Sequence, residues 1–455
     1  MSRELEQSFQ SVERLLAAFR HAGCDEVLVK PLAKQQDNEK NQIYLGQNMT
    51  MVSYFPGNVC LRANSTSIAK HRSEPGKAIV SLELDFYWLW PSGEASVAPN
   101  ASIIEYAQYP EVRLSGFSAN CSRSPQALKR DLQGSYGRRY LVLGIAAEKV
   151  FGAVVTEVGD PRTVKGFELL PAWPVQPLLK VLDSGKTGID EGRLVEEVRN
   201  VCGRIHKPQI LSREGDAPQQ ISPVSQAGGW TLEALLGIPR NSRSGPDKYG
   251  FEVKAVGGSR TSVITTEADF GFRAEQGVAE FLTKYGRPAK DGSKKLVFTG
   301  IQKCGQPNEQ SGTVLTIENW DFTTNTPTGE GQPNVVLIEQ KSEEVIAGWS
   351  FAKLASSWTK KHAGALYVET SKVTGASGEI AGYRYGSIGL LGKGTSPLLL
   401  LEQVALGNVF LDPGDSKKPD SPAHARTQWR VNGSISGPLT ERLAPLYHDL
   451  KSLQL

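Results

Sequence analysis

The sequence contains little cysteine. Its five cysteines are odd in number and lie far apart among 455 residues, with no Cys-x-x-Cys pair and no zinc-finger spacing. Small secreted domains usually carry an even set of closely spaced cysteines, whereas cytosolic thiols stay reduced. The cysteine pattern therefore argues against a disulfide scaffold or a zinc finger, and it predicts a reducing, cytoplasmic compartment.

The sequence also lacks long apolar segments. No run of 18 apolar residues occurs, so no membrane-spanning helix is predicted. The first six residues include three charged side chains, whereas a secretory signal peptide needs an apolar centre. We find no internal repeat and no low-complexity segment. These absences favour a globular cytoplasmic protein that does not contact membranes.

An excess of charge of one sign is absent as well. Lys and Arg number 51 and Asp and Glu number 48, which gives a net charge of +3. Any basic surface for nucleic acid must therefore be local. Apolar residues make up 39% and charged residues 22%, an ordinary balance for a soluble chain. The length predicts two or three domains.

What the sequence does contain is a charged stretch of ten residues, 245–254, that follows an expected helix at 231–237. Asp247 follows a proline, and a Pro-Asp pair favours a turn or the entry to a strand. Apolar residues then alternate with Glu252 and Lys254, which is the periodicity of a strand. Glu252 and Lys254 are therefore expected on one face of that strand, with Asp247 at its start.

Two carboxylates beside an ammonium suit a metal-dependent phosphodiesterase. Mg2+ prefers oxygen ligands, commonly one or two carboxylates with water and phosphate, so Asp247 and Glu252 are the candidate metal ligands. Lys254 can orient the attacking water, or take its proton if the pKa of the lysine is depressed. The alternative is a solvated charged strand edge beside a turn.

Residues 231–254 resemble the active-site region of the MvaI/BcnI type of PD-(D/E)XK restriction endonucleases. That family carries a helix with the pattern Thr-(Leu/Phe)-Glu-x-Leu-Leu, followed by Pro-Asp-x4-Glu-x-Lys. The resemblance extends over about residues 226–455. Further segments resemble the family in the same order: Lys284-Tyr285-Gly286, Trp349-Ser350-Phe351, Tyr367-Val368-Glu369-Thr370-Ser371-Lys372, Tyr383-Arg384-Tyr385, His424 and Trp429-Arg430-Val431.

The resemblance implies a type II site-specific deoxyribonuclease of a prokaryotic restriction-modification system. It implies a C-terminal α/β PD-(D/E)XK fold with a central mixed sheet, Mg2+ as cofactor, and 5′-phosphate and 3′-hydroxyl products. The chain shows one such site, so cutting both strands requires either nicking in turn with reorientation or a dimer. The resemblance favours a monomer that nicks in turn, and it implies a target such as CCWGG. It further implies that Glu233 faces the metal site and that His424 lies near the scissile phosphate. The residues alone leave Glu233 open as an exposed helix charge and His424 as a lone loop histidine.

The order of elements expected after Lys254 agrees with an α/β domain. The sequence predicts two helices, around 274–285 and at 350–361. It predicts strands at 262–266, 295–299, 314–318, 335–339 and 366–370.

The apolar periodicity of the N-terminal part predicts a different pattern, with a helix at 5–20 followed mostly by strands. The strands are expected at 27–29, 42–45, 49–52, 78–88, 111–117 and 140–145. Turn-rich segments separate them, which predicts an all-β small barrel or pseudobarrel. This layout resembles the effector DNA-binding pseudobarrel of the EcoRII type, which is related to the plant B-three transcription factors. The resemblance implies that this domain binds a second DNA site as an effector.

Two polar segments of the N-terminal part, 30–41 and 113–123, are candidate DNA-binding arms. Amides and arginines pair with purine edges, and Ser or Lys can hold phosphates. The alternative is a pair of solvated loops. The candidate contacts are Lys34, Gln35, Gln36, Asn38, Lys40, Arg113, Ser115, Asn120 and Arg123.

Residues 155–226 are rich in proline and other turn residues and contain one expected helix, at 191–205. We therefore predict an effector domain at 1–180, a linker with a short helix at 181–225, and a catalytic domain at 226–455. Gly185-Lys186-Thr187 is not read as a phosphate loop, because the glycine four residues before the Gly-Lys pair is missing.

Two further functions remain compatible with the sequence. One is a repair-type nicking nuclease of the same fold. The other is a DNA-binding regulator in which the C-terminal fold is only a scaffold, although the complete Asp-Glu-Lys set argues against that alternative.

Overall fold

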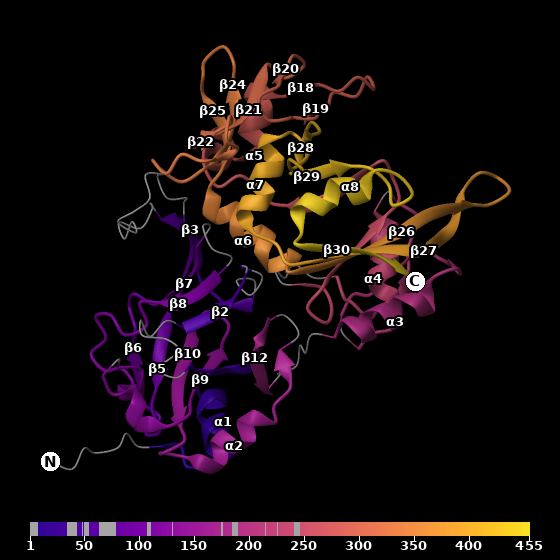
Figure 1. The fold of residues 1–455 in the computed structure, drawn as a ribbon. Helices are drawn as coiled ribbons and strands as arrows, with labels where there is room; N and C mark the ends of the chain where they lie inside the picture. Colours follow the sequence, from indigo (N-terminus) through magenta and orange to yellow (C-terminus); the bar gives the residue numbers. More distant parts are fainter. Residues whose placement is uncertain are drawn as a thin grey trace. The chain divides into compact units, whose positions relative to one another are not determined.

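The structure is a computed structural model that divides the chain into two compact units, Met1–Ile189 and Asp190–Leu455 (Figure 1). In the described part of the chain, no helix is long and apolar enough to cross a membrane. The structure describes residues 8–33, 43–47, 49, 54–62, 79–106, 111–129, 131–173, 176–183, 190–213, 215–224, 226–240 and 246–455.

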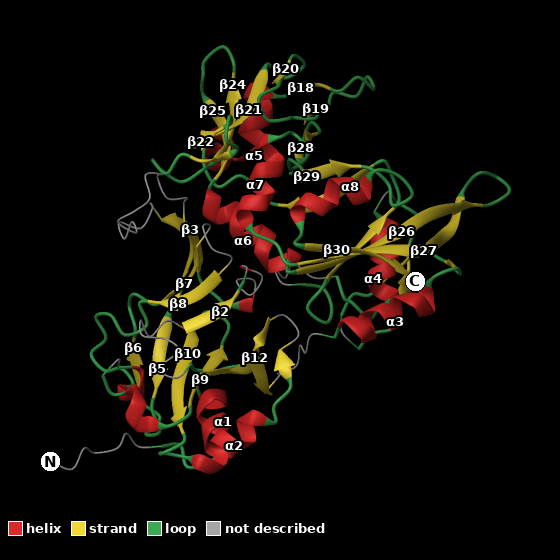
Figure 2. Ribbon diagram, viewed as in Figure 1, coloured by secondary structure: helices red, strands yellow, loops and turns green. Residues whose placement is uncertain are grey.

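The first unit consists mostly of strands, with two α-helices, α1 and α2 (Figure 2). One sheet has seven strands in the order β11-β12-β1-β9-β10-β5-β6, and the other has five in the order β2-β8-β7-β4-β3. The elements are α1 (Val12–His21), β1 (Glu26–Pro31), β2 (Ile43–Gly46), β3 (Asn58–Arg62), β4 (Ile79–Glu83), β5 (Phe86–Leu89), β6 (Ala95–Val97), β7 (Ser102–Tyr106), β8 (Glu111–Ser115), two 3-10 helices (Gln126–Leu128 and Gln133–Tyr136), β9 (Arg139–Ile145), β10 (Val150–Thr156), α2 (Pro161–Glu168), β11 (Ala172–Trp173) and β12 (Gln176–Asp183).

Within the described residues neither sheet closes on itself, so the all-β character is present without a closed barrel. The strand expected at 78–88 is two strands, because the chain leaves the five-stranded sheet after β4 and enters the seven-stranded sheet at β5. The helix expected from residue 5 begins only at Val12. Gln10 has a positive φ of 65°, and the Ser11 side chain then accepts a hydrogen bond from the Arg14 amide as the helix cap.

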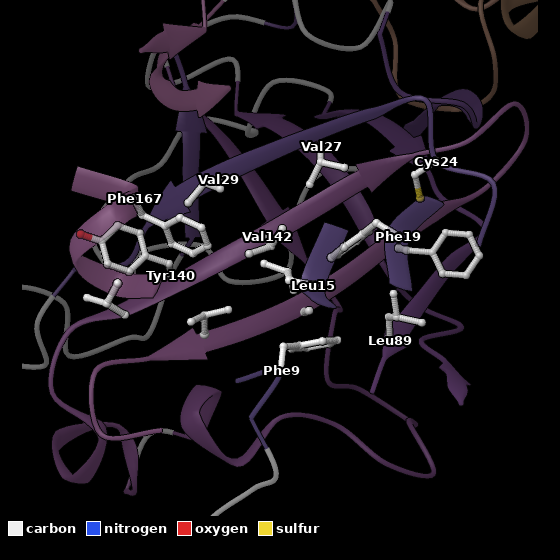
Figure 3. Close-up of a cluster of buried hydrophobic side chains, with 14 residues drawn as sticks. Phe9, Leu15, Phe19, Cys24, Val27, Val29, Leu89, Tyr140, Val142 and Phe167 are labelled. Carbon is white, nitrogen blue, oxygen red and sulfur yellow. The ribbon is translucent and has the colours of Figure 1, made fainter. Parts of the chain in front are cut away.

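The core of this unit lies between its helices and the larger sheet (Figure 3). Leu15 and Phe19 of α1 are fully buried, as is Val142 on β9. A Cβ atom on Gly144 would lie 2.2 Å from the Phe19 ring, so the packing of α1 on β9 requires glycine there. The spacing of apolar residues in the N-terminal helix therefore does predict its buried face.

The second unit is a mixture of helices and several sheets. Its helices are α3 (Glu191–Val201), α4 (Ala227–Leu235), α5 (Phe272–Tyr285), α6 (Phe351–His362), α7 (Pro397–Ala405), α8 (Leu439–Leu443) and a 3-10 helix (Ala444–Leu446). Its strands are β13 (Ile205–His206), β14 (Gln209–Ile210), β15 (Gln219–Gln220), β16 (Glu252–Val256), β17 (Arg260–Thr265), β18 (Arg287–Pro288), β19 (Leu296–Thr299), β20 (Pro307–Asn308), β21 (Thr313–Ile317), β22 (Trp320–Asp321), β23 (Thr326–Pro327), β24 (Val335–Glu339), β25 (Val345–Trp349), β26 (Gly364–Thr374), β27 (Ile380–Lys393), β28 (Phe410–Lys417), β29 (Thr427–Asn432) and β30 (Asp449–Gln454).

Two of these sheets position the charged residues. In the first, with the order β13-β27-β26-β16, β16 runs parallel to β26 while β26 and β27 are antiparallel, so the sheet is mixed as expected. The second has the order β17-β29-β28-β19-β18. The expected helices and strands of this half are confirmed, and Gly277, with a φ of 82°, interrupts α5. Residues 190–225, which composition placed in a linker, pack in the second unit, and the functional domain boundaries stay predictions.

A buried ion pair fixes α5 against the second sheet. Arg273 donates from Nε to Asp415 Oδ2 at 2.8 Å and from its terminal nitrogen to Oδ1 at 3.1 Å. The two side chains are only 5% and 2% exposed. The Asp415 carboxylate also accepts from the Arg426 amide at 2.7 Å, just before β29. The strand that begins after Arg426 is therefore held in place by a carboxylate that has no access to water.

We predict that Asp415→Asn destabilises the protein, because it removes the buried carboxylate that pairs with Arg273 and leaves the guanidinium with Glu267, whose side chain is 45% exposed. Losing one partner of a buried ion pair costs about 3–5 kcal/mol, and the remaining pair with Glu267 places the expected loss near the lower end of that range. The matched control is Glu344→Gln, which breaks an ion pair with Lys284 whose partners are 37% and 47% exposed. Thermal unfolding measures the stability of both variants. Similar melting temperatures would show that the buried Asp415 pair contributes no more to stability than the exposed Glu344 pair.

Candidate active site

A tight turn explains the spacing of the charged residues. Lys248 and Phe251 form an antiparallel bridge, with hydrogen bonds in both directions. The two residues between them, Tyr249 and Gly250, both have positive φ values, of 49° and 77°. This is the backbone of a two-residue hairpin turn that reverses the chain. The four residues between Asp247 and Glu252 therefore fold Asp247 back beside the new strand.

The reversal gives the Asp247 carboxylate a fixed position. Its Oδ2 accepts a hydrogen bond from the Val253 amide at 2.9 Å, next to Glu252. Tyr249 is a bulky residue in a left-handed conformation, which is uncommon outside glycine. Its hydroxyl donates to Glu197 Oε1 of α3 at 2.7 Å, and this bond holds the turn. The helix expected at 191–205 ends earlier, at Val201, and Ile205 belongs to strand β13. Helix α3 supports the turn but does not line the cleft.

Glu252 lies between two lysines. Lys254 Nζ is 2.9 Å from Glu252 Oε1, as the alternation in the strand predicts. Lys361, near the end of α6, donates to both Glu252 oxygens at 3.3 Å. The Glu252 side chain is 6% exposed, whereas those of Lys254 and Lys361 are 18% and 32% exposed. The buried carboxylate is thus neutralised by two cations that reach the surface.

Glu233 joins this group from helix α4. Glu233, Asp247, Glu252, Lys254 and Lys361 all line one open cleft, which has a volume of about 680 Å³. The structure therefore brings together four of the five predicted catalytic residues. Glu233 is half-buried and lines the cleft, so it is not a fully exposed helix charge, and its role at the metal site stays a prediction.

The carboxylates of the cleft repel one another. Burial, together with the charges of Asp247 and Glu252, raises the pKa of Glu233 to about 7. Burial and the charge of Glu252 likewise raise the pKa of Asp247. Burial opposes ionisation of Glu252, but Lys254 and Lys361 outweigh it and lower the pKa of that carboxyl. The carboxyls of Glu233 and Asp247 therefore ionise less readily than free carboxyls, whereas Glu252 ionises more readily between its two lysines.

The pKa of Lys254 does not support the expectation that this lysine takes a proton from the attacking water. Burial alone would lower the pKa of its ammonium, but the charge of Glu252 and the hydrogen bond to it raise the pKa above the ordinary value. The depressed pKa that proton abstraction by Lys254 requires is therefore not found. The geometry favours a permanent ammonium that orients a water molecule or a phosphate.

The donor set fits a hard divalent cation. Carboxylate oxygens are the ligands that Mg2+ prefers, and partly uncompensated carboxylates attract a cation. Among the described residues, no three His, Cys, Asp or Glu side chains form a complete protein-only metal centre. A Mg2+ ion commonly takes one or two carboxylates together with water and phosphate oxygens. Asp247 and Glu252 are the residues that would hold it.

The remaining predicted site residues lie elsewhere. His424 is exposed in the loop between β28 and β29 and pairs through its backbone with Ser416, and it does not line the cleft. Its role near the phosphate stays a prediction. Lys34, Gln35, Gln36, Asn38 and Lys40 fall outside the described residues.

The second candidate DNA-binding arm is described by the structure. The guanidinium of Arg113, on β8, lies 5.0 Å from the centre of the Tyr44 ring. The guanidinium of Arg123 lies 3.6 Å from the centre of the Trp90 ring, with Glu94 at 3.7 Å. Ser115 ends β8, and Asn120 has a positive φ of 59° in the turn that follows. The segment is therefore a shaped turn rather than an irregular loop.

Sequence reasoning missed a polar wall of the cleft. Arg260 and Ser262 of β17 line it, and so do Gln428 and Arg430 of β29. Arg430 donates to Ser262 at 3.1 Å and pairs with Asp412 at 2.9 Å. Alternation along β29 could have placed Gln428 and Arg430 on one face, but no local signal links that face to Glu252. Lys361 was missed for the same reason.

The model of the MvaI/BcnI restriction endonuclease family matches residues 195–435. Among solved structures, the "Restriction endonuclease MvaI-cognate DNA substrate complex" shares 18% identity, with a TM-score of 0.42. "Restriction endonuclease MvaI in the absence of DNA" shares 14% identity, with a TM-score of 0.30. Each comparison covers 58% of this chain and 99% of the other. No curated protein matches the sequence.

We predict that Glu233→Gln stabilises the metal-free protein at pH 8 but not near pH 4.5. The raised pKa of Glu233, about 7 against an ordinary value of 4.5, means that the folded state retains a proton that the unfolded state has released. Stability is therefore lost as the pH rises between these values, and it stays lower above them. Removing the charge should restore about 1–3 kcal/mol at pH 8.

Thermal unfolding in the presence of a chelator measures the effect. Glu441→Gln, an exposed position on α8, serves as the matched control. Equal stabilisation of the Glu233 variant at both pH values would contradict a raised pKa.

Proposed function

The chain belongs to the MvaI/BcnI restriction endonuclease family and is a type II site-specific nuclease, and we propose that its cleft hydrolyses double-stranded DNA with Mg2+. The products would carry 5′-phosphate and 3′-hydroxyl ends. The observation that carries the proposal is the convergence of Asp247, Glu252, Lys254 and Glu233 in one cleft, from a turn, a strand and a helix.

Each residue has a distinct role in the proposal. Asp247 and Glu252 would hold Mg2+, which when bound supplies an acidified water ligand and positive charge for phosphate oxygens. Lys254 stays protonated and orients the attacking water or a phosphate oxygen. Glu233, with a pKa of about 7, can accept and release a proton near neutral pH. His424 is also proposed to contact the scissile phosphate. Because it does not line the cleft, this contact would require its exposed loop to move.

The polar wall of the cleft supports DNA as the substrate. Arg and Gln pair with purine edges, and Arg also binds phosphate. Arg260, Gln428 and Arg430 present these groups in the same cleft as the carboxylates. We propose a target such as CCWGG, from the family resemblance. From the family resemblance we also propose a cytoplasmic monomer that nicks one strand, reorients and nicks the other.

The first unit is proposed as an effector domain that binds a second copy of the target, with a pseudobarrel that reads DNA through two arms. The turn that follows β8 supports this, because Asn120 and Arg123 project polar groups next to an ordered sheet. Arg113 and Ser115 on β8 are proposed contacts as well, although the Arg113 side chain is 18% exposed and pairs with Glu111. The segment containing Lys34 to Lys40 would form the other arm.

We predict that Mg2+ converts supercoiled plasmid with CCWGG sites first into nicked circles and then into linear molecules. Lys254→Ala should lower the rate at least about a hundredfold, because it removes a charge that acts on the reacting groups. Lys360→Ala, an exposed lysine on α6, is the matched control and should cut normally. A gel time course with mapped ends measures both. Binding without any cleavage would support the regulator, and nicking without sequence preference would support a repair-type nuclease.

We also predict that a plasmid with two target sites is cut several times faster than a plasmid with one. Replacing Asn120 and Arg123 together by Ala should remove most of the difference, since each lost contact of this kind weakens DNA binding by about 1–3 kcal/mol. Arg20→Ala, at an exposed position on α1, is the control in the same unit. An unchanged ratio of rates in the double variant would exclude these residues from effector binding.

A further inference from the structure

Among the described residues, two lysines form ion pairs with Glu252, and Lys361 is the one that comes from outside the hairpin turn and strand β16. Its ammonium lies 3.3 Å from each of the two Glu252 oxygens, whereas Lys254 contacts only one of them. A cation placed evenly between both oxygens of a carboxylate occupies a position that a divalent ion can also take. Lys361 thus shares its binding place with the expected ion.

The end of α6 is anchored so that Lys361 points at this place. The neighbouring His362 is fully buried, donates from Nε2 to the Val263 carbonyl at 2.7 Å, and accepts at Nδ1 from the Tyr447 hydroxyl at 2.6 Å. Its ring stacks on Trp358, one turn earlier, with centroids 4.1 Å apart. The backbone at Lys361 is therefore fixed, while the side chain remains 32% exposed and lines the cleft.

We propose that Lys361 is a resident counter-ion that neutralises Glu252 in the metal-free enzyme and competes with the divalent ion for that carboxylate. The inference rests on the proposed function, because it takes Glu252 as a metal ligand. Lys254 pairs with only one oxygen of the buried Glu252, and Lys361 supplies the cation at the other oxygen before the ion arrives, because a poorly compensated buried charge is costly. When an ion takes over that role, the long side chain of Lys361 can turn into the cleft, where its ammonium is available to a phosphate.

Binding of Ca2+ to the full-length protein without DNA tests this competition. Ca2+ takes the same oxygen ligands as Mg2+, and isothermal titration calorimetry reports binding without any cleavage. We expect Lys361→Met to bind Ca2+ about tenfold more tightly than the wild type, which corresponds to about 1.4 kcal/mol for a lost competing ion pair. Lys361→Gln, which keeps a polar end without the charge, should do the same.

Two further variants make the outcome decisive. Lys360→Met carries the same change at an exposed position on α6 and should bind Ca2+ like the wild type. Glu252→Ala should lose binding. Suppose that both Lys361 variants bind Ca2+ as well as the wild type or more weakly, and that binding still depends on Glu252. That result would overturn the proposed counter-ion role of Lys361 but not the metal-dependent function. No binding by any of these proteins would overturn both the counter-ion and the metal-dependent function. Melting temperatures identify any variant that fails to fold.

Discussion

The buried carboxylate of Glu252 imposes the main constraint on the second unit. Its side chain is 6% exposed, and an ionised group at that depth must be paired. Strand β16 supplies Lys254, and helix α6 supplies Lys361. Strand β16 and the end of helix α6 thus each contribute a lysine that pairs with the same carboxylate. A site built this way is rigid at its base and charged at its opening, which is what binding and cleaving a phosphodiester requires.

The elements around Glu252 bring two further carboxyl groups to the same cleft. The hairpin turn brings Asp247 back to the strand, and α4 brings Glu233 to the same cleft. Their pKa values are raised because the carboxylates crowd one another and are buried. Crowding of like charges is unfavourable for folding, and sites that bind cations commonly accept that penalty. The same feature that weakens the metal-free fold therefore prepares the cleft for a cation.

The second sheet adds recognition chemistry to this centre. Asp412 links Arg260 on β17 to Arg430 on β29, and the buried Arg273–Asp415 pair holds the start of β29. Polar side chains that are held by such pairs lose little freedom on binding DNA, which favours specificity. The residues proposed for catalysis and those proposed for recognition thus come from two sheets and line one cleft.

The sequence by itself determined the local part of the site. A period of two residues places Glu252 and Lys254 on one face of a strand, and the Pro-Asp pair favours a turn or a strand entry at Asp247. The hairpin turn that folds Asp247 back beside the strand was not predicted. The elements of the second unit and the buried face of the N-terminal helix were predictable for the same reason, because apolar periodicity is local. Tertiary structure alone decided the pairing of Lys361 with Glu252, 109 residues away, and the position of the Gln428–Arg430 face. It also decided that the described strands of the first unit form two open sheets, and that the charge of Glu252 outweighs burial and raises the pKa of Lys254. Such properties depend on which distant groups share a buried volume, and no sequence spacing encodes that distance.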